Sequence, residues 1–132
     1  MEDWKIKISV LWLFPLVAFL ASAVLMFLEP GVLDQIIAGE VEGVKLGSEL
    51  LLVGAVIDVL GPLAMSFLSL TLKGSINRWA NILVGMLYAV LEFITLLEQL
   101  ANPKGYAILM LIAAVVAPVL IVWYAWKSKQ KA

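Results

Sequence analysis

The stretch ISVLWLFPLVAFLASAVLMFL, residues 8–28, contains no charged side chain. A helix that crosses the hydrocarbon core of a bilayer needs about 20 mostly apolar residues, and this stretch supplies them. Three more stretches of the same character extend over residues 50–72, 79–100 and 105–126, and the only charges within them are acidic. The sequence therefore predicts an all-α integral membrane protein, with residues 1–132 forming one transmembrane domain of four spans.

The overall composition supports this fold class and narrows the chemistry. Hydrophobic residues make up 64% of the 132 residues and charged residues 14%, and a chain of this length cannot bury so much apolar surface in one soluble core. Cys and His are both absent, which excludes thiolate and imidazole chemistry and the usual zinc sites. The net charge of −1 argues against nucleic acid as a partner. We expect no enzymatic activity, no cofactor and no metal.

The positive side chains are distributed unevenly between the two sides of the membrane. Lys45 and Lys104 fall on one side, and the other side holds Lys5, Lys7, Lys73, Arg78, Lys127, Lys129 and Lys131. Because loops rich in Lys and Arg remain in the cytoplasm, we expect a multi-pass protein of the cell (cytoplasmic) membrane with both termini cytoplasmic. The aromatic residues expected to anchor that interface are Trp4, Trp12, Trp79, Trp123, Tyr124 and Trp126.

The connection between the first two spans, residues 29–48, is long and acidic. Pro30 and Gly31 end the first span. Apolar residues then fall at positions 32, 33, 36 and 37, which predicts a short amphipathic helix on the outer surface. The predicted fold is therefore a four-helix bundle, N-in and C-in, with a long acidic outer loop that contains this helix.

Small and polar residues of the second and third spans recur at helical spacing. On the second span they are Gly54, Asp58, Gly61, Met65 and Ser69. On the third span they are Asn81, Gly85, Tyr88, Glu92, Thr95 and Gln99. Small and polar residues on one helix face are typical of close packing between membrane helices. We therefore expect a compact bundle, surrounded by the lipid bilayer, with both polar faces turned inward.

Asp58 and Glu92 are the acids that lie deepest within the spans. With a rise of about 1.5 Å per residue, their positions in the two helices differ in depth by roughly 2 Å, so they are neighbours if the two faces meet. The spans contain no Lys, Arg or His that would neutralise them, and an ionised acid at membrane depth costs about 2.5–3.5 kcal/mol. At least one carboxyl is therefore expected to carry a proton or bind a cation.

Three interpretations of this pair remain open. The two acids form a proton or cation site, or they are neutral carboxyls that hydrogen-bond across helices, or they line an outer water-filled vestibule or a subunit interface. Tyr88 precedes Glu92 by one turn and is expected to donate a hydrogen bond to it. The predicted ligand- or ion-binding residues are Asp58, Glu92, Tyr88, Thr95 and Asn81.

Three short motifs resemble a family of small prokaryotic four-span membrane proteins of unknown function. They are LEPGVL at residues 28–33, NRWANI at residues 77–82 and IVWYAW at residues 121–126. In size and layout the chain is also similar, more loosely, to DoxX-like membrane proteins. The resemblance implies a four-helix membrane fold without an established activity, and the DoxX-like similarity implies an anchor or a quinone-side partner of an oxidoreductase. From its residues alone, the second motif is better explained by structure: Asn77 caps the third span and Asn81 hydrogen-bonds across helices.

These observations favour a small non-enzymatic membrane protein whose Asp58/Glu92 site binds a proton, a cation or a small polar ligand, in a role that includes transport. Two alternatives belong to other classes. One is a structural or accessory subunit that anchors a larger membrane complex, and the other is a quinone- or lipid-binding module. Four spans enclose little volume, so a permeation path would form more easily in a homo-oligomer.

Overall fold

The computed structural model describes residues 3–41, 43–101 and 103–128, and it contains four helical segments long and apolar enough to cross a membrane. Their bounds are α1 (Asp3–Phe27), a second segment (Ser48–Thr71), α5 (Gly74–Ala101) and α6 (Gly105–Lys127). The second segment consists of α3 (Ser48–Gly54), the π-helix η1 (Ala55–Leu60) and α4 (Gly61–Thr71). The predicted all-α fold with four apolar helices is thus confirmed, although α1 and α5 begin before the predicted spans.

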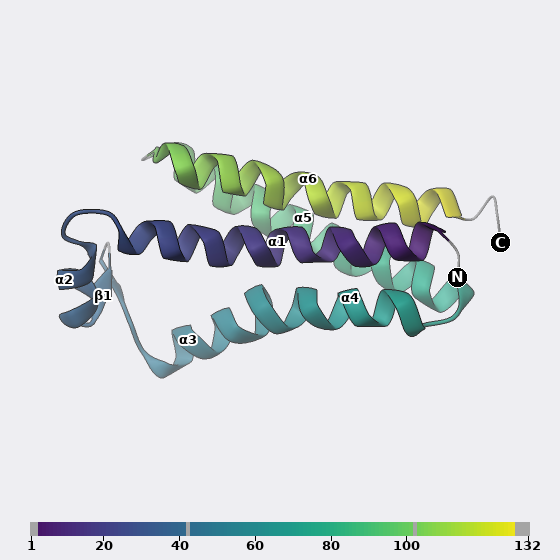
Figure 1. The fold of residues 1–132 in the computed structure, drawn as a ribbon, viewed down its shortest axis with the longest axis horizontal. Helices are drawn as coiled ribbons and strands as arrows, with labels where there is room; N and C mark the ends of the chain where they lie inside the picture. Colours follow the sequence, from purple (N-terminus) through teal and green to yellow (C-terminus); the bar gives the residue numbers. More distant parts are fainter. Residues whose placement is uncertain (1–2, 42, 102, 129–132) are drawn as a thin grey trace.

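The four helical segments run alongside one another, and both ends of the chain lie at the same end of the bundle (Figure 1). We call this the terminal end, and the opposite end the loop end. The loop end contains α2 (Val32–Ile37), which lies in the region where the sequence predicted a short helix. Gly31, with φ of 85°, precedes α2 in the left-handed conformation that side chains rarely adopt.

A small hairpin that the sequence did not predict follows α2. Its strands β1 (Glu40–Val41) and β2 (Val44–Lys45) are antiparallel, with Glu40 opposite Lys45 and Val41 opposite Val44. Gly43, with φ of 81°, lies in the turn between the strands, where a positive φ suits a tight hairpin. The described part of the loop thus contains a short helix and a two-stranded hairpin before the second segment begins.

The tightly packed part of the bundle lies towards the terminal end. There α1 packs against α4 and α6, and α6 packs against α5. The core consists of Ile8, Trp12, Met65, Ile82, Tyr88, Ile121 and Ala125. Gly85 allows the close approach of α5 to α6, since a Cβ at this position would lie 2.9 Å from Cγ2 of Val122. Small residues serve helix packing in this way because apolar surface alone does not drive helices together in lipid.

The bundle opens towards the loop end. Neither α3 nor η1 contains a buried residue, and α3 diverges from α1 in Figure 1. The polar faces of the second and third spans predicted a compact bundle, and the structure differs from this prediction in the loop half. The second segment changes from α-helix to π-helix at Ala55–Leu60, and an interruption of this kind is a recognised cause of helix bending.

Candidate functional site

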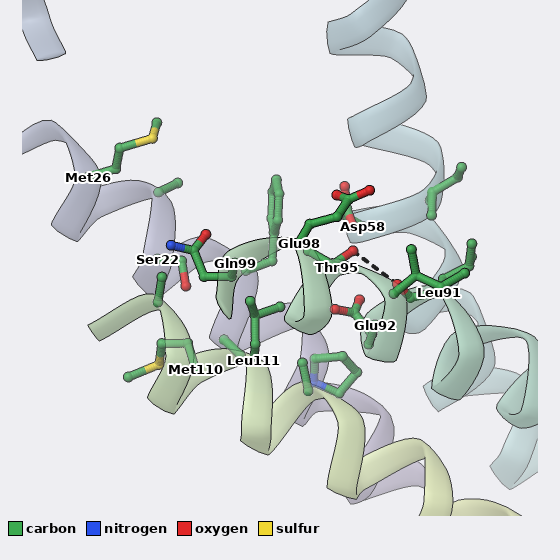
Figure 2. A pocket seen from close by; sticks show the side chains of 18 of the residues that line it. Ser22, Met26, Asp58, Leu91, Glu92, Thr95, Glu98, Gln99, Met110 and Leu111 are labelled. Atoms are coloured by element: carbon green, nitrogen blue, oxygen red, sulfur yellow. Dashed lines mark hydrogen bonds between the residues drawn. The ribbon is translucent and has the colours of Figure 1, made fainter. Parts of the chain in front are cut away.

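A cavity of about 640 Å³ lies in the loop half of the bundle, among α1, the α3–η1 region, α5 and α6 (Figure 2). Its volume falls within the range of about 300–1,000 Å³ that is typical of small-molecule sites. Most of its lining is apolar, and the polar side chains among the lining residues are Ser22, Asp58, Tyr88, Glu92, Thr95, Glu98, Gln99, Lys104 and Tyr106. Four of the five residues predicted for the site therefore line one cavity.

Asp58 and Glu92 reach this cavity from different elements. Asp58 is carried by η1 and Glu92 by α5, and both are half-buried. Within the part of the chain that the structure describes, neither carboxyl forms a hydrogen bond or an ion pair. One interpretation of the pair was that two neutral carboxyls hydrogen-bond across helices. The structure shows no such hydrogen bond between Asp58 and Glu92. The sequence predicted that the two acids are neighbours, and both line this cavity (Figure 2).

Tyr88 does not bind Glu92, as the sequence predicted; this is a correction. Its hydroxyl donates to the backbone carbonyl oxygen of Ile57 at 2.5 Å. Local helix geometry explains the choice. The N–H of Gly61 donates to the carbonyl of Val56, five residues earlier, and the next residue, Pro62, has no N–H with which to continue this pattern to Ile57. The Tyr88 hydroxyl therefore satisfies a carbonyl that proline leaves open.

Gly61 directly follows η1 and faces Tyr88, and the structure leaves no room there for a larger residue. A Cβ on Gly61 would collide with the Tyr88 hydroxyl and lie 3.3 Å from the carbonyl oxygen of Val56. Glycine is therefore needed for the approach of α5 to the π-helical turn. Asp58 lies in that same turn, so the Tyr88–Ile57 hydrogen bond links α5 to the turn that carries Asp58.

Thr95 lines the cavity, and its hydroxyl donates to the carbonyl of Leu91 at 2.9 Å. Its oxygen keeps lone pairs for a ligand. Asn81, by contrast, does not line the cavity. Its side chain is fully buried in the terminal half, so the structure separates it from the other four predicted residues. The prediction that included Asn81 in the site is corrected by this position.

Asn81 belongs to a buried polar network that joins three helices. Its Oδ1 accepts hydrogen bonds from Nε1 of Trp12 at 2.7 Å and from Oγ of Ser69 at 3.0 Å. Its Nδ2 donates to Oδ1 of Asn77 at 2.7 Å and to the Asn77 carbonyl at 3.0 Å. The prediction that Asn81 hydrogen-bonds across helices is thus confirmed. Trp12, expected at the membrane interface, is instead completely buried as the donor in this network.

Asn77 has a different role from the helix cap that the sequence predicted. Helix α5 already begins at Gly74, so Asn77 lies inside its first turns. The Asn77 Nδ2 donates to the carbonyls of Ser69 at 2.7 Å and Leu72 at 3.1 Å. These carbonyls are at the C-terminal end of α4, where the helix supplies no N–H partners. Asn77 therefore completes the end of the preceding helix, not the start of its own.

Arg78 lies beside this network with its guanidinium between two indole rings. Its Cζ is 4.9 Å from the ring centre of Trp79 and 5.0 Å from that of Trp126, and its Nε donates to the carbonyl of Ala125 at 3.2 Å. Stacking on aromatic faces is a characteristic interaction of guanidinium groups. This contact joins the start of α5 to the end of α6 at the terminal end.

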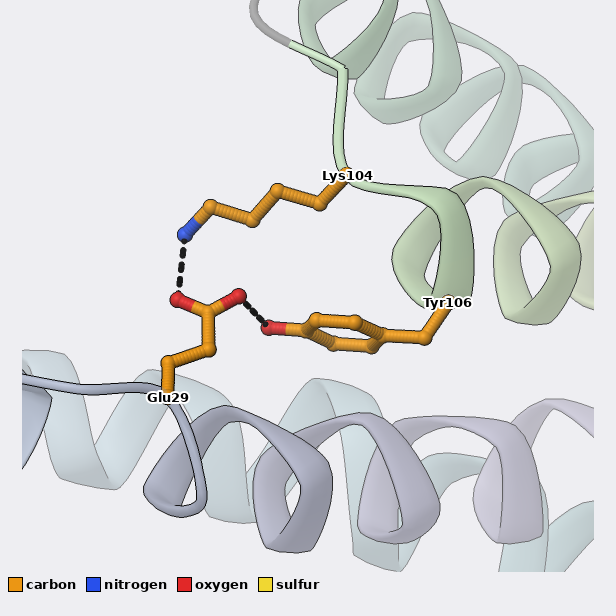
Figure 3. Close-up of polar contacts among 3 residues, drawn as sticks. All are labelled: Glu29, Lys104 and Tyr106. Atoms are coloured by element: carbon orange, nitrogen blue, oxygen red, sulfur yellow. Dashed lines mark hydrogen bonds and ion pairs between the residues drawn. The ribbon is translucent and has the colours of Figure 1, made fainter.

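At the loop end, Glu29 joins the chain after α1 to the start of α6 (Figure 3). Its Oε2 pairs with Nζ of Lys104 at 3.0 Å, and its Oε1 accepts a 2.6 Å hydrogen bond from the Tyr106 hydroxyl. The Tyr106 hydrogen bond, followed by Lys104, lowers the pKa of Glu29 below its ordinary value. We call these three residues the Glu29 latch. Lys104 and Tyr106 also line the cavity.

Sequence reasoning did not find the latch or the additional lining residue Glu98. Glu29 and Lys104 are separated by 75 residues, and Glu98 is not among the residues predicted for the site. The signal that would have pointed to the latch is the placement of an acid just after the first span and a base just before the fourth, on the same side of the membrane. Opposite charges at adjoining helix ends attract one another.

The fold and its composition define a multi-pass membrane protein with four apolar helices. The chain belongs to a family of unknown function (DUF6326), whose model matches residues 1–132. This confirms the predicted resemblance to an uncharacterised family and gives no support to the looser similarity to DoxX-like proteins. No curated protein and no solved structure matches the chain.

Proposed function

We propose that the protein binds protons and monovalent cations at Asp58 and Glu92 and carries them across a cell membrane without enzymatic activity. The observation that carries the proposal is that these two unpaired carboxyls, from η1 and α5, line one cavity within the spans. Both chain ends lie at the same end of the bundle (Figure 1), and we propose that this end is cytoplasmic because it holds most of the Lys and Arg residues.

The charge balance of the cavity supports a cationic ligand. Its acidic lining residues are Asp58, Glu92 and Glu98, and its basic lining residue is Lys104, which pairs with Glu29. An ionised carboxylate at membrane depth costs about 2.5–3.5 kcal/mol on insertion scales. Binding either a proton or a cation removes that cost, so the two ligands compete for the same carboxyls. A protein that exchanges protons for cations across a membrane requires such competition between the two ligands.

Flux measurements in proteoliposomes test this proposal. Wild-type protein should carry protons or rubidium ions down an imposed gradient, and Asp58→Asn and Glu92→Gln should each reduce that flux severely. Asp34→Asn and Glu49→Gln are matched controls, because each removes one negative charge from an exposed position outside the cavity. Flux that is absent from the wild type under every gradient, or retained by the Asp58→Asn/Glu92→Gln double variant, would contradict the proposal.

A second candidate function, that of a subunit in a homo-oligomer or a larger membrane complex, is favoured by one observation. Helix α3 has no buried residue and leaves its apolar side chains Leu50, Leu51, Leu52 and Val53 exposed. Lipid covers such a surface, and so does a partner helix. Mass determination in native nanodiscs separates the two: a fixed multiple of the chain mass supports a homo-oligomer, a constant additional mass supports a complex, and a single chain supports neither.

A further inference from the structure

The cavity beside Asp58 and Glu92 is far larger than a proton or a bare inorganic ion requires. Its volume is about 640 Å³, whereas one water molecule occupies about 30 Å³ in the liquid. The residues that line it from α1 and α6 are mainly apolar, and Phe19, Met26, Met110 and Leu111 are among the largest. Such walls offer a hydrated ion few oxygen partners, but they suit the carbon skeleton of an organic molecule.

The charges in the cavity restrict that molecule to a cation. Three carboxyls line it, and its basic lining residue, Lys104, pairs with Glu29. Tyr88, Tyr106 and Phe19 also line it, and aromatic rings attract organic cations through their negative faces. The described residues contain no group of three or more side chains arranged to hold a metal ion, whereas calcium takes about six to eight oxygen ligands.

We propose that the ligand of this site is a monovalent organic cation with an apolar or aromatic body, such as a quaternary ammonium or phosphonium compound. The inference rests on the proposed function and specifies its substrate class. The positive charge lies near Asp58 and Glu92, and the apolar body contacts the α1 and α6 walls. Protonation of the carboxyls removes their attraction for the cation, so acid releases it.

The titratable groups that line the cavity determine this dependence on pH. They are Asp58 of η1, Tyr88, Glu92 and Glu98 of α5, Lys104 just before α6, and Tyr106 of α6; α1 contributes none. Acidification neutralises carboxylates, and carboxylates are the groups proposed to attract the cation. Lower pH therefore weakens the affinity for a cation and leaves that for a neutral molecule of the same shape unchanged.

Equilibrium dialysis of the purified full chain in detergent tests the inference with two probes of nearly equal shape. Tetraphenylphosphonium is the cation and tetraphenylborate is the corresponding anion. We expect saturable binding of the cation and none of the anion. Asp58→Asn or Glu92→Gln should weaken the affinity for the cation about tenfold or more. The attraction between two unit charges a few ångströms apart exceeds the free energy of a tenfold change in affinity. The controls Asp34→Asn and Glu49→Gln should bind it as the wild type does.

Cavity-filling variants keep the carboxyls and remove the space. Ala107 of α6 and Ala23 of α1 both line the cavity, and replacing either by Phe should abolish tetraphenylphosphonium binding. Two positions on different helices guard against one variant that fails to fold, and circular dichroism with size-exclusion chromatography verifies each preparation. Binding that survives in both folded variants overturns the proposed location.

The remaining outcomes separate this inference from the function on which it rests. Carboxylate-dependent proton or rubidium flux without tetraphenylphosphonium binding overturns the substrate class and leaves the proposed function in place. Equal binding of cation and anion, or binding of the cation that persists in the Asp58→Asn/Glu92→Gln double variant, shows an apolar lipid pocket and also overturns the substrate class. A wild type that neither binds tetraphenylphosphonium nor carries protons or rubidium ions overturns both proposals.

Discussion

The hydroxyl of Tyr88 donates a 2.5 Å hydrogen bond to the backbone carbonyl of Ile57, and this bond links α5 to the π-helical turn that carries Asp58. The ring of Tyr88 also meets the ring of Trp12 edge-on, with centres 5.4 Å apart. Trp12 in turn donates to Asn81. The open cavity of the loop half and the buried polar network of the terminal half are thus connected through one tyrosine side chain.

Replacing Tyr88 by Phe should destabilise the protein by about 0.5–1.5 kcal/mol, because it removes the hydrogen bond to the Ile57 carbonyl. Thermal unfolding in detergent measures this loss. Tyr124→Phe is the matched control, since the Tyr124 side chain has ring contacts with Trp123 and Lys7 and its hydroxyl forms no hydrogen bond with any residue that the structure describes. Equal stability of Tyr88→Phe and Tyr124→Phe would show that the Ile57 carbonyl has another partner.

Replacing Gly61 by Ala should also destabilise the protein, by about 1–3 kcal/mol, because the new Cβ meets the Tyr88 hydroxyl. Gly54→Ala is the control within the same segment, where a Cβ has only an ordinary contact of 3.8 Å with Asp58. In a double-mutant cycle, Tyr88→Phe should reduce the cost of Gly61→Ala because it removes the atom that collides. Strict additivity of the two substitutions would refute this explanation.

Replacing Asn81 by Leu should lower stability by about 1–3 kcal/mol, because Nε1 of Trp12 and the side chain of Asn77 lose their partners inside the bundle. Cation binding and flux in the folded fraction should equal those of the wild type, because Asn81 does not line the cavity. Unfolding in detergent and a flux assay on the same preparation test both statements. A selective loss of flux with unchanged stability would return Asn81 to the binding site.

The Glu29 latch should stabilise the fold at neutral pH and lose its effect in acid. Its partners Tyr106 and Lys104 lower the pKa of Glu29 in the folded state from the ordinary value of 4.5. A lowered folded-state pKa means that the stabilisation is complete above the unfolded-state pKa and disappears as the pH falls through the folded-state pKa. The midpoint of thermal unfolding should therefore be higher for the wild type than for Glu29→Gln at neutral pH, and the two should converge below about pH 4.5.

Glu49→Gln provides the control for this pH series, because Glu49 is an exposed acid at the start of α3. Its unfolding midpoint should follow that of the wild type throughout. A difference between the wild type and Glu29→Gln that stays constant from neutral to acidic pH would show that Glu29 acts through packing and not through its charge.

The membrane-spanning architecture was predictable because hydropathy is a local property of the chain. Each stretch such as residues 8–28 is apolar enough to predict a helix by itself, and an even number of spans returns the chain to the end where it began. Counting residues along two helices also predicted that Asp58 and Glu92 are neighbours, and both line one cavity. Composition also excluded thiol and imidazole chemistry before any partner was known.

The partners of individual polar side chains were decided only by the tertiary structure. Tyr88 was expected to bind Glu92 one turn away, yet it binds Ile57 of another segment because Pro62 leaves that carbonyl without a helical donor. Asn81 shares a helix face with Glu92 but lies in the packed half of the bundle, so Trp12 and Ser69 occupy its oxygen. The hydrogen-bond partner of a polar side chain depends on which helices approach one another and at what depth. The apolar spans, by contrast, are determined by the free energy of transferring each segment from water into lipid.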